Sequence, residues 1–170
     1  MITRFFTLLF LVAVASGQTP APPEVHVKLS LAENKTVYRI GEPVKIVMEF
    51  TADREGYVVE HISDGNDLMF DKLIISPDTG FTYWYNEFAD NLHYGRDYFG
   101  IEKLTSSPRR VEIVLNDSLR FDSPGRYTVS VVTTRVKKAA KEPLNEPLTA
   151  STNAISFEVQ AISDEDEARR

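Results

Sequence analysis

The chain of 170 residues contains no cysteine. This absence excludes disulfide bonds, thiolate metal sites and a cysteine nucleophile. A folded domain must therefore depend on its apolar core. A chain of this length buries roughly two-thirds of its unfolded surface, which is sufficient for one such domain.

Long apolar runs are also scarce. One run extends from Phe5 to Ala15, follows Arg4, and ends near the small residue Gly17. This arrangement is typical of a secretory signal peptide cleaved between Gly17 and Gln18. The run is shorter than the ~20 residues that span a bilayer, although an uncleaved anchor is the alternative. We expect a signal peptide over residues 1–17, no membrane span after its cleavage, and a secreted or periplasmic location.

Positive charge is in deficit, with 19 Lys and Arg against 25 Asp and Glu and a net charge of -6. A nucleic-acid partner needs a clustered basic face, so none is expected. Lys137, Lys138 and Lys141 stand close together, but glutamates lie beside them. They predict a solvated loop.

Helical periodicity is absent before residue 163, and period-two alternation takes its place. Val25, Val27, Leu29 and Leu31 share one face of a predicted strand. Further strands are predicted around 37–40, 44–50, 56–63, 68–77, 109–117, 125–136 and 155–159. Seven or eight strands separated by turn signals indicate an antiparallel β-sandwich.

The expected domain organisation follows from this pattern. The sandwich covers residues 25–161, after a Pro-rich linker over 18–24. Residues 162–170 form either an acidic tail or the start of a helix in a longer parent chain, since Ser163 and Asp166 make a capping box.

One stretch carries a resemblance to a known superfamily. Pro124 and Gly125 predict a turn with a positive φ at Gly125, Tyr127 follows, and Val129 faces inward. This resembles the tyrosine corner of immunoglobulin-like (Ig-like) domains, in which the hydroxyl bonds to backbone a few residues upstream. Val129 stands where antibody domains have their second cysteine, whereas Ser123 replaces the usual aspartate and the Cys-Trp-Cys signature is missing.

The layout is most similar to disulfide-free Ig-like modules of secreted bacterial proteins, including uncharacterised acidobacterial ones. The segments 37–50 and 119–131 carry this resemblance. Macroglobulin-type and proteinase-inhibitor-type bacterial sandwiches have similar pairs of segments. The resemblance implies a fold and no activity.

Catalytic and metal-binding patterns are weak. His26, His61 and His93 have no metal-ligand spacing. The segment 64–71 is rich in aspartate but lacks the EF-hand order, so a hairpin turn is the better interpretation than calcium. No nucleophile elbow or other catalytic motif is present. We expect no enzyme activity, no metal and no cofactor.

The most unusual region is an aromatic-rich insertion over 81–100. It contains Phe81, Tyr83, Trp84, Tyr85, Phe88, Tyr94, Tyr98 and Phe99. Such rings either fasten a loop over the sandwich or form a recognition surface. The candidate binding residues are Trp84 and Tyr85, together with Tyr83, Asn86 and Arg96.

The sequence thus predicts a secreted, non-catalytic Ig-like interaction or scaffolding module. Its partner would be an unknown protein or its own C-terminal continuation. One alternative is a carbohydrate-binding module that uses Trp84 and its neighbours for polysaccharide. The other is a proteinase-inhibitor-like sandwich.

Overall fold

A computed structural model of the chain describes residues 19–20, 24–62, 70–83, 99–139 and 147–162. Within these residues the secondary structure is almost entirely β-strand, with two short 3-10 helices, η1 (Ala32–Asn34) and η6 (Leu115–Asp117). The prediction of an all-β chain with antiparallel sheets is confirmed. The predicted signal peptide and the tail from residue 163 lie outside the described residues.

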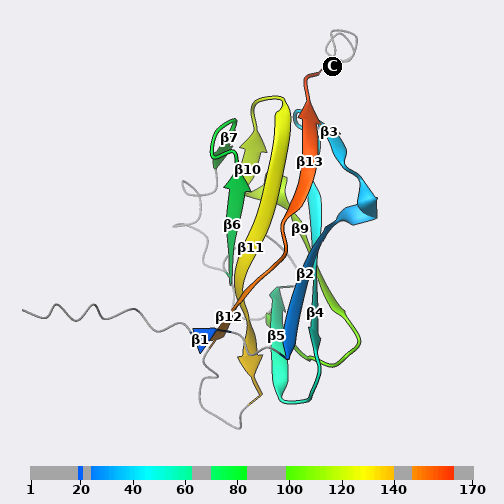
Figure 1. The fold of residues 1–170 in the computed structure, drawn as a ribbon, viewed down its shortest axis with the longest axis vertical. Helices are drawn as coiled ribbons and strands as arrows, with labels where there is room; N and C mark the ends of the chain where they lie inside the picture. The colour runs from blue at the N-terminus through cyan, green and yellow to red at the C-terminus, as the bar shows by residue number, and fades with distance from the viewer. Residues whose placement is uncertain (1–18, 21–23, 63–69, 84–98, 140–146, 163–170) are drawn as a thin grey trace, which may run out of the picture.

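Thirteen strands are present in the described part of the chain (Figure 1). They are β1 (Thr19–Pro20), β2 (Val25–Leu31), β3 (Val37–Arg39), β4 (Lys45–Ala52), β5 (Tyr57–Ile62), β6 (Asp71–Ser76), β7 (Phe81–Tyr83), β8 (Phe99–Lys103), β9 (Arg109–Val114), β10 (Leu119–Phe121), β11 (Gly125–Lys138), β12 (Pro147–Ser151) and β13 (Ile155–Gln160).

Strand β4 shows why the alternation produces these strands. Ile46, Met48 and Phe50 are completely buried, whereas Lys45 is exposed and Glu49 is half-buried. Successive side chains of a strand point to opposite faces, so one face enters the core and the other meets solvent. β4 is the central strand of a three-stranded antiparallel sheet in the order β2-β4-β9.

The larger sheet is built around β11. Val129 pairs with Ile75 of β6 on one side and with Ile155 of β13 on the other. Farther along β11, Val136 pairs with Val59 of β5 and with Leu148 of β12. β5 and β6 therefore follow one edge of β11, and β12 and β13 follow the other.

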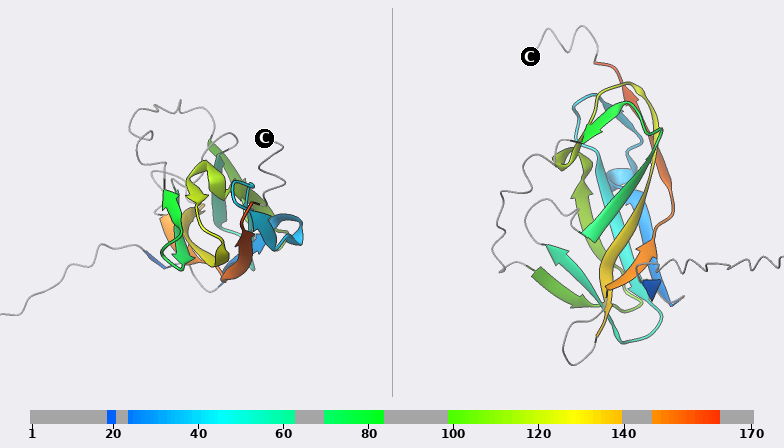
Figure 2. Two further views of the ribbon diagram at one scale, coloured as in Figure 1. Left: turned by 90° about the horizontal axis from the view of Figure 1, so that it is seen from above. Right: turned by 90° about the vertical axis from the view of Figure 1, so that its left-hand side faces the viewer.

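Short strands complete this sheet at its margins. β8 pairs with β5, as the right-hand view of Figure 2 shows. β3 runs parallel to β13, and β1 runs parallel to β12, with Thr19 opposite Leu148. Two residues of the predicted linker thus take part in a sheet. A separate two-stranded sheet joins β7 to β10.

The apolar faces of the two larger sheets meet in one core. Met48 and Phe50 of β4 lie in the same buried cluster as Val129 and Val131 of β11 and Phe157 of β13. All five side chains are at most 2% exposed. Each fully buried apolar side chain of this size contributes about 1.5–3 kcal/mol, so the shared core is the main source of stability.

The predicted corner lies between β10 and β11. Tyr127 is buried, and its hydroxyl oxygen lies 2.8 Å from the carbonyl oxygen of Ser123 and 2.9 Å from that of Gly80. Gly125 has a positive φ of 159°, but this is nearly extended, and the residue pairs with Val159. The residue in the left-handed region at the corner is Gly80, with a φ of 84°. The sequence pattern did not predict this position.

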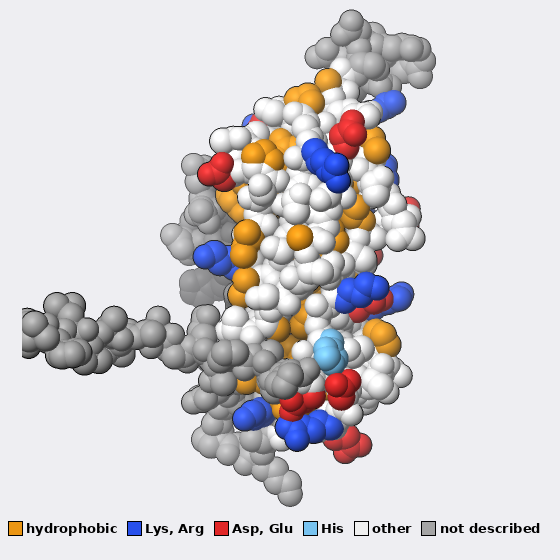
Figure 3. Space-filling view, viewed as in Figure 1, with side chains coloured by type: hydrophobic (Ala, Val, Ile, Leu, Met, Phe, Trp, Pro, Cys, Tyr) orange, Lys and Arg blue, Asp and Glu red, His pale blue; other side chains and the backbone are white. Residues whose placement is uncertain are grey.

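The outer face of the larger sheet carries little charge in its middle. Ile74 of β6 is 50% exposed there, opposite Ser130 of β11. The hydroxyl oxygens of Thr128 and Ser156 are 2.9 Å apart across β11 and β13. Figure 3 shows neutral and hydrophobic side chains in the middle of this face and charged ones toward its margins.

Candidate functional site

The described surface is hollowed where β3 turns into β4. Three hollows of about 610, 480 and 240 Å³ surround this turn. The first is lined by β3 with Lys35, Glu42 and Gln160, and the second by Gly41, Thr82, Asn116, Leu119 and Arg120. Gly41 also lines the first hollow, and Lys35 and Glu42 also line the third. We call the three together the turn groove.

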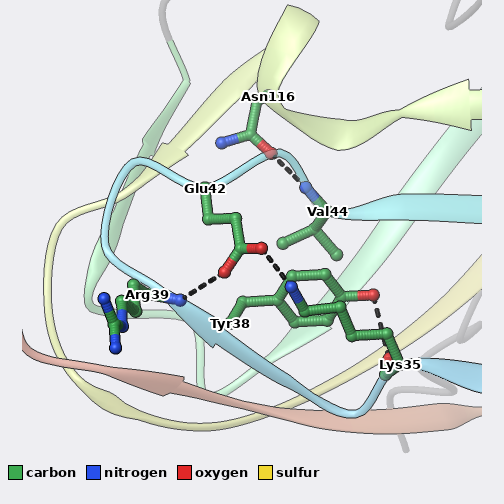
Figure 4. A network of polar contacts seen from close by, with 6 residues as sticks. All are labelled: Lys35, Tyr38, Arg39, Glu42, Val44 and Asn116. Atoms are coloured by element: carbon green, nitrogen blue, oxygen red, sulfur yellow. Dashed lines mark hydrogen bonds and ion pairs between the residues drawn. The ribbon is translucent and has the colours of Figure 1, made fainter.

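Glu42 fixes the shape of the turn. Its carboxylate accepts hydrogen bonds from Lys35 Nζ and from the N–H of Arg39, the latter at 3.0 Å (Figure 4). The N–H of Glu42 donates in return to the carbonyl oxygen of Arg39 at 2.9 Å. The hydrogen bonds from Lys35 and Arg39 lower the pKa of the Glu42 carboxyl below its ordinary value. Glu42 is therefore ionised and engaged at neutral pH.

Tyr38 ties the turn to the core. Its side chain is buried, and its ring meets Phe157 edge to face with the centroids 5.6 Å apart. The hydroxyl donates to the carbonyl oxygen of Lys35 at 2.9 Å, and Lys35 Nζ lies 5.1 Å from the ring centroid. Burial raises the pKa of Tyr38, and the negative charges of Glu42 and Glu33 add to that effect. Tyr38 thus contacts Lys35 both at its backbone carbonyl and at its ammonium group.

Asn116 forms the opposite wall. Its side-chain oxygen accepts the N–H of Val44 at 2.7 Å, and the N–H of Leu115 donates to the carbonyl oxygen of Val44 at 2.9 Å. Because Val44 is bound by the oxygen, the amide nitrogen of Asn116 points the other way, as Figure 4 shows. Asn116 therefore presents an N–H donor group at the rim of the groove.

Arg120 closes the second hollow. Its Nε lies 2.5 Å from Asp122 Oδ1, and the hydroxyl of Thr82 donates to Asp122 Oδ2 at 2.6 Å. These two hydrogen bonds, that from Thr82 first, lower the pKa of Asp122. The side chain of Arg120 remains 68% exposed. The guanidinium is therefore oriented and still open to solvent.

Of the sequence-predicted binding residues, the structure describes only Tyr83. Tyr83, at the end of β7, is 45% exposed, and its ring meets Phe81 edge to face at 5.4 Å between centroids. Burial of part of the ring raises the pKa of Tyr83. Trp84, Tyr85, Asn86 and Arg96 lie outside the described residues. The corner residues Pro124, Gly125 and Tyr127 shape the backbone between β10 and β11, as described above.

Sequence reasoning did not predict the turn groove. The predicted strands over 37–40 and 44–50 leave Gly41, Glu42 and Pro43 only as a break between them. The close spacing of Lys35, Arg39 and Glu42 around that break was the available signal. Asn116 and Arg120 carried none, because they are distant in the chain.

A buried ionic cluster is a second feature that the sequence did not reveal. Arg135 is fully buried, and its Nη2 and Nε lie 2.7 and 2.8 Å from Asp71 Oδ2. Lys137 Nζ lies 2.6 Å from Glu60 Oε1. Burial raises the pKa of Asp71, against the opposing effect of Arg135. The cluster lies at the junction where β6 ends and β5 begins along one edge of β11. We interpret it as a structural feature of that junction.

Metal and membrane features can be assessed within the same residues. Among them, no group of three or more His, Asp or Glu side chains converges as a metal site requires. His26 instead lies 3.0 Å from Asp53 on the exposed surface. The described residues include no helix that is long and apolar enough to cross a membrane. Searches with protein-family models and against curated protein sequences find no match to this chain.

Proposed function

We propose that the chain is a secreted, non-catalytic Ig-like module that binds a partner through the turn groove. The single observation that carries the binding role is the groove itself. Its charged and polar side chains are fixed in place by the hydrogen bonds of Glu42, Tyr38 and Asn116. Such pre-organisation reduces the entropy lost on binding, which is the usual design of a recognition surface on a rigid scaffold.

The strand order supports the Ig-like part of this proposal. If β1 with β3, β5 with β6, and β12 with β13 are each counted as sharing one strand position, the larger sheet reads β1/β3, β12/β13, β11, β5/β6 and β8. The other sheet reads β2, β4 and β9, which gives five and three strands, or eight in all. Ig-like sandwiches divide a similar number of strands between two sheets. The buried Val129 and the Tyr127 corner fit the same scheme.

Secretion is proposed on the sequence of residues 1–17, which has the charge, apolar run and small residues of a signal peptide. The absence of cysteine is compatible with this location, because the fold then depends on no disulfide bond and therefore on no particular redox environment.

Carbohydrate binding is the second candidate. The half-exposed ring of Tyr83 favours it, since an amphipathic ring with one face in solvent can contact a sugar. A proteinase-inhibitor-like role remains a prediction from the sequence resemblance alone.

Binding to immobilised peptide and oligosaccharide panels tests the proposed function. The variant Arg39→Ser/Arg120→Ser removes two positive charges from the groove. The matched variant Lys72→Ser/Arg110→Ser removes two from other exposed strands, and Arg110, like Arg120, leaves a carboxylate partner behind. We expect retention to be lost in the first variant and kept in the second, with equal thermal unfolding midpoints. Equal retention by both variants would mean that the groove is not the binding surface.

A further inference from the structure

Strand β9 is one edge of the smaller sheet. Among the described residues it pairs with β4 alone, and β2 is the opposite edge of the same sheet. An edge strand presents a row of backbone N–H and C=O groups with which a further strand can pair. The two edges differ in how far these groups are already occupied.

The hydrogen bonds at the end of β9 show which of its backbone groups face the free edge. The N–H of Leu115 donates to the carbonyl oxygen of Val44 at 2.9 Å, in register with the β4–β9 ladder. Alternate residues of a strand direct their N–H and C=O groups to opposite sides. The odd-numbered residues of β9 therefore bond to β4. The even-numbered residues Arg110, Glu112 and Val114 turn their backbone groups to the free edge.

The corresponding edge of β2 is occupied at its centre. The side chain of Asn153 accepts the N–H of Leu29 at 2.8 Å and donates to its carbonyl oxygen at 3.0 Å. It takes the position of a pairing residue and so blocks a further strand. In the described part of the chain, no side chain or backbone group occupies the even-numbered positions of β9 in this way.

The side chains of β9 divide into a buried apolar face and an exposed charged face. Val111 and Ile113 are 6% and 4% exposed and belong to the core. Arg110 and Glu112 point outward, with 72% and 53% of their side chains exposed. A strand that extends the sheet must repeat this division and offer charges opposite to those it meets. β9 of a second copy has both properties.

Charge selects one register for such a pairing. Directly opposite residues of an antiparallel pair point to the same face, so even-numbered residues must lie opposite even-numbered ones. A twofold axis near the middle of β9 then passes through Arg110, Glu112 or Val111. The first two positions place Arg110 opposite Arg110 or Glu112 opposite Glu112, and like charges directly opposite are unfavourable. The axis through Val111 places Arg110 of each copy opposite Glu112 of the other.

The backbone groups at the free edge fit the same register. Arg110 of one copy and Glu112 of the other form a hydrogen-bonded pair, which exchanges both N–H···O bonds, and the symmetry repeats this pair. The N–H of Val114 faces the carbonyl oxygen of Pro108 in the other copy. Pro108 has no N–H to donate, so the ladder ends there.

The ion pairs within each copy do not prevent this contact. Arg110 lies 2.8 Å from Glu49, and Glu112 lies 3.3 Å from Lys45. A guanidinium carries several N–H donors and a carboxylate several acceptor sites, so each can meet a second partner. Across the joined sheets, Glu49 and Arg110 of one copy and Glu112 of the other then form a row of alternating sign.

We infer that β9 pairs antiparallel with β9 of a second copy of the chain, about a twofold axis through Val111. The two smaller sheets thereby join into one continuous sheet. This interface lies on β9 and does not depend on the turn groove.

The interface is small, because it consists of one strand edge of 6 residues. Stable interfaces bury about 1,200–2,000 Å² in total, so we expect a dissociation constant on the order of 10⁻⁵ to 10⁻³ M. The panel experiment is run below this concentration, where the chain is monomeric. Its Lys72→Ser/Arg110→Ser control therefore still reports on the turn groove alone.

Two charge reversals and their mixture test the pairing, by analytical ultracentrifugation of the full chain over a concentration series. Arg110→Glu and Glu112→Arg each place like charges opposite in both symmetric rows. Each variant alone should dimerise at least about tenfold more weakly than the unchanged chain. Mixed in equal amounts, the two variants should associate with each other about as tightly as the unchanged chain, because every row again joins opposite signs.

Lys28→Glu is the matched control. Lys28 lies opposite Glu49 on one side of β4, as Arg110 does on the other, and the change in net charge is the same. This variant should dimerise like the unchanged chain. A chain that stays monomeric throughout the series, a dimer that neither reversal weakens, or a mixture that associates no better than its components overturns the inference.

Hydrogen exchange of the unchanged chain locates the interface. The N–H groups of Arg110 and Glu112 should exchange more slowly as the concentration of the chain rises, and that of Ile101 at the edge of β8 should not. Slow exchange of Arg110 and Glu112 at every concentration would mean that the chain's own residues cover this edge. Slowing at Ile101 instead would place the interface on β8. Either result overturns the inference.

Discussion

At the scale of single residues, the hydroxyl of Tyr127 joins two separate segments of backbone. It can donate its proton to the carbonyl oxygen of Ser123 or to that of Gly80, which also accepts the N–H groups of Asp122 and Ser123. Ser123 and Gly80 come from different turns, one before β11 and the other before β7. The corner thus holds the β6–β7 turn against the start of the central strand.

Removal of this hydroxyl should weaken the fold. We predict that Tyr127→Phe lowers the free energy of unfolding by about 1–2 kcal/mol, because a buried carbonyl loses its donor. Urea unfolding followed by fluorescence measures the change. An unchanged midpoint would show that the hydroxyl does not stabilise the corner.

Gly80 is predicted to be irreplaceable at the same corner. A Cβ at this position would lie 2.5 Å from the Tyr127 hydroxyl oxygen, and the φ of 84° is itself unfavourable for other residues. Gly80→Ala should therefore destabilise by about 2–4 kcal/mol, the sum of backbone strain and a displaced buried group. Gly56→Ala is the control, because φ is 108° there but nothing lies within 4 Å of the added Cβ. Equal losses for the two variants would rule out the contact with Tyr127.

Glu42 gives a prediction for pH. Its pKa is lowered in the folded chain, so its contribution to stability is complete above the unfolded value and is lost as the pH falls through the folded value. The N–H resonance of Arg39, which donates to Glu42, should therefore titrate with a midpoint below the ordinary glutamate value of 4.5. In Glu42→Gln this titration should disappear. A midpoint at or above the ordinary value would contradict the hydrogen bonds that Glu42 accepts from Lys35 and Arg39.

At the scale of elements, β11 organises the larger sheet because it is long enough to serve two sets of neighbours. Its register shifts between Thr133 and Val136, where β6 gives way to β5. Arg135 lies within this shift and is buried with Asp71. The ionic cluster therefore fills the junction at which regular pairing is interrupted.

Removing one partner of the Arg135–Asp71 ion pair should destabilise the fold more than replacing both partners with apolar residues. Asp71→Ala leaves the Arg135 guanidinium buried without its carboxylate and should cost about 3–5 kcal/mol. Asp71→Leu with Arg135→Met removes both charges and is expected to cost less than the single change. Chemical unfolding of the single and double variants measures both values. A double variant that is no more stable than Asp71→Ala would show that the pair itself stabilises the junction.

At the scale of the whole molecule, we expect local stability to be highest at the centre of the larger sheet and lowest at its edges. Val129 and Val131 are fully buried, and Val129 is paired with a strand on both sides. Val131 pairs with Leu73 of β6 on one side, and on the other its N–H and carbonyl groups hydrogen-bond to Thr152. Ile101 of β8 is 61% exposed at the margin of the same sheet. We predict that native-state hydrogen exchange is slowest at Val129 and Val131 and much faster at Ile101, because edge strands open locally at a lower free energy. Comparable protection at Ile101 would indicate that another chain covers β8.

Across the whole molecule, the strands that could be predicted from the sequence are those with one buried and one solvated face. Strong alternation predicted β2, β4, β9 and β11, where one face is buried and the other is solvated. The sequence predicts no strand between 77 and 109, yet β7 and β8 lie there, because edge strands can expose apolar residues such as Ile101 and so lose the alternation. The expectation of a solvated loop at Lys137 and Lys138 is wrong, because both residues belong to β11. β12 was also not predicted, and it begins at Pro147 because a Pro at the first position of a strand is tolerated.

The sequence by itself determined the all-β class and the core face of the long strands, because period-two alternation depends only on neighbouring residues. It also determined the acidic net charge and the lack of disulfides. Only the tertiary structure decided where charges gather. Asn116 meets Val44 across 72 positions of sequence, and Arg135 meets Asp71 across 64. The turn groove and the buried ionic cluster are made by such distant pairs, which no local pattern encodes.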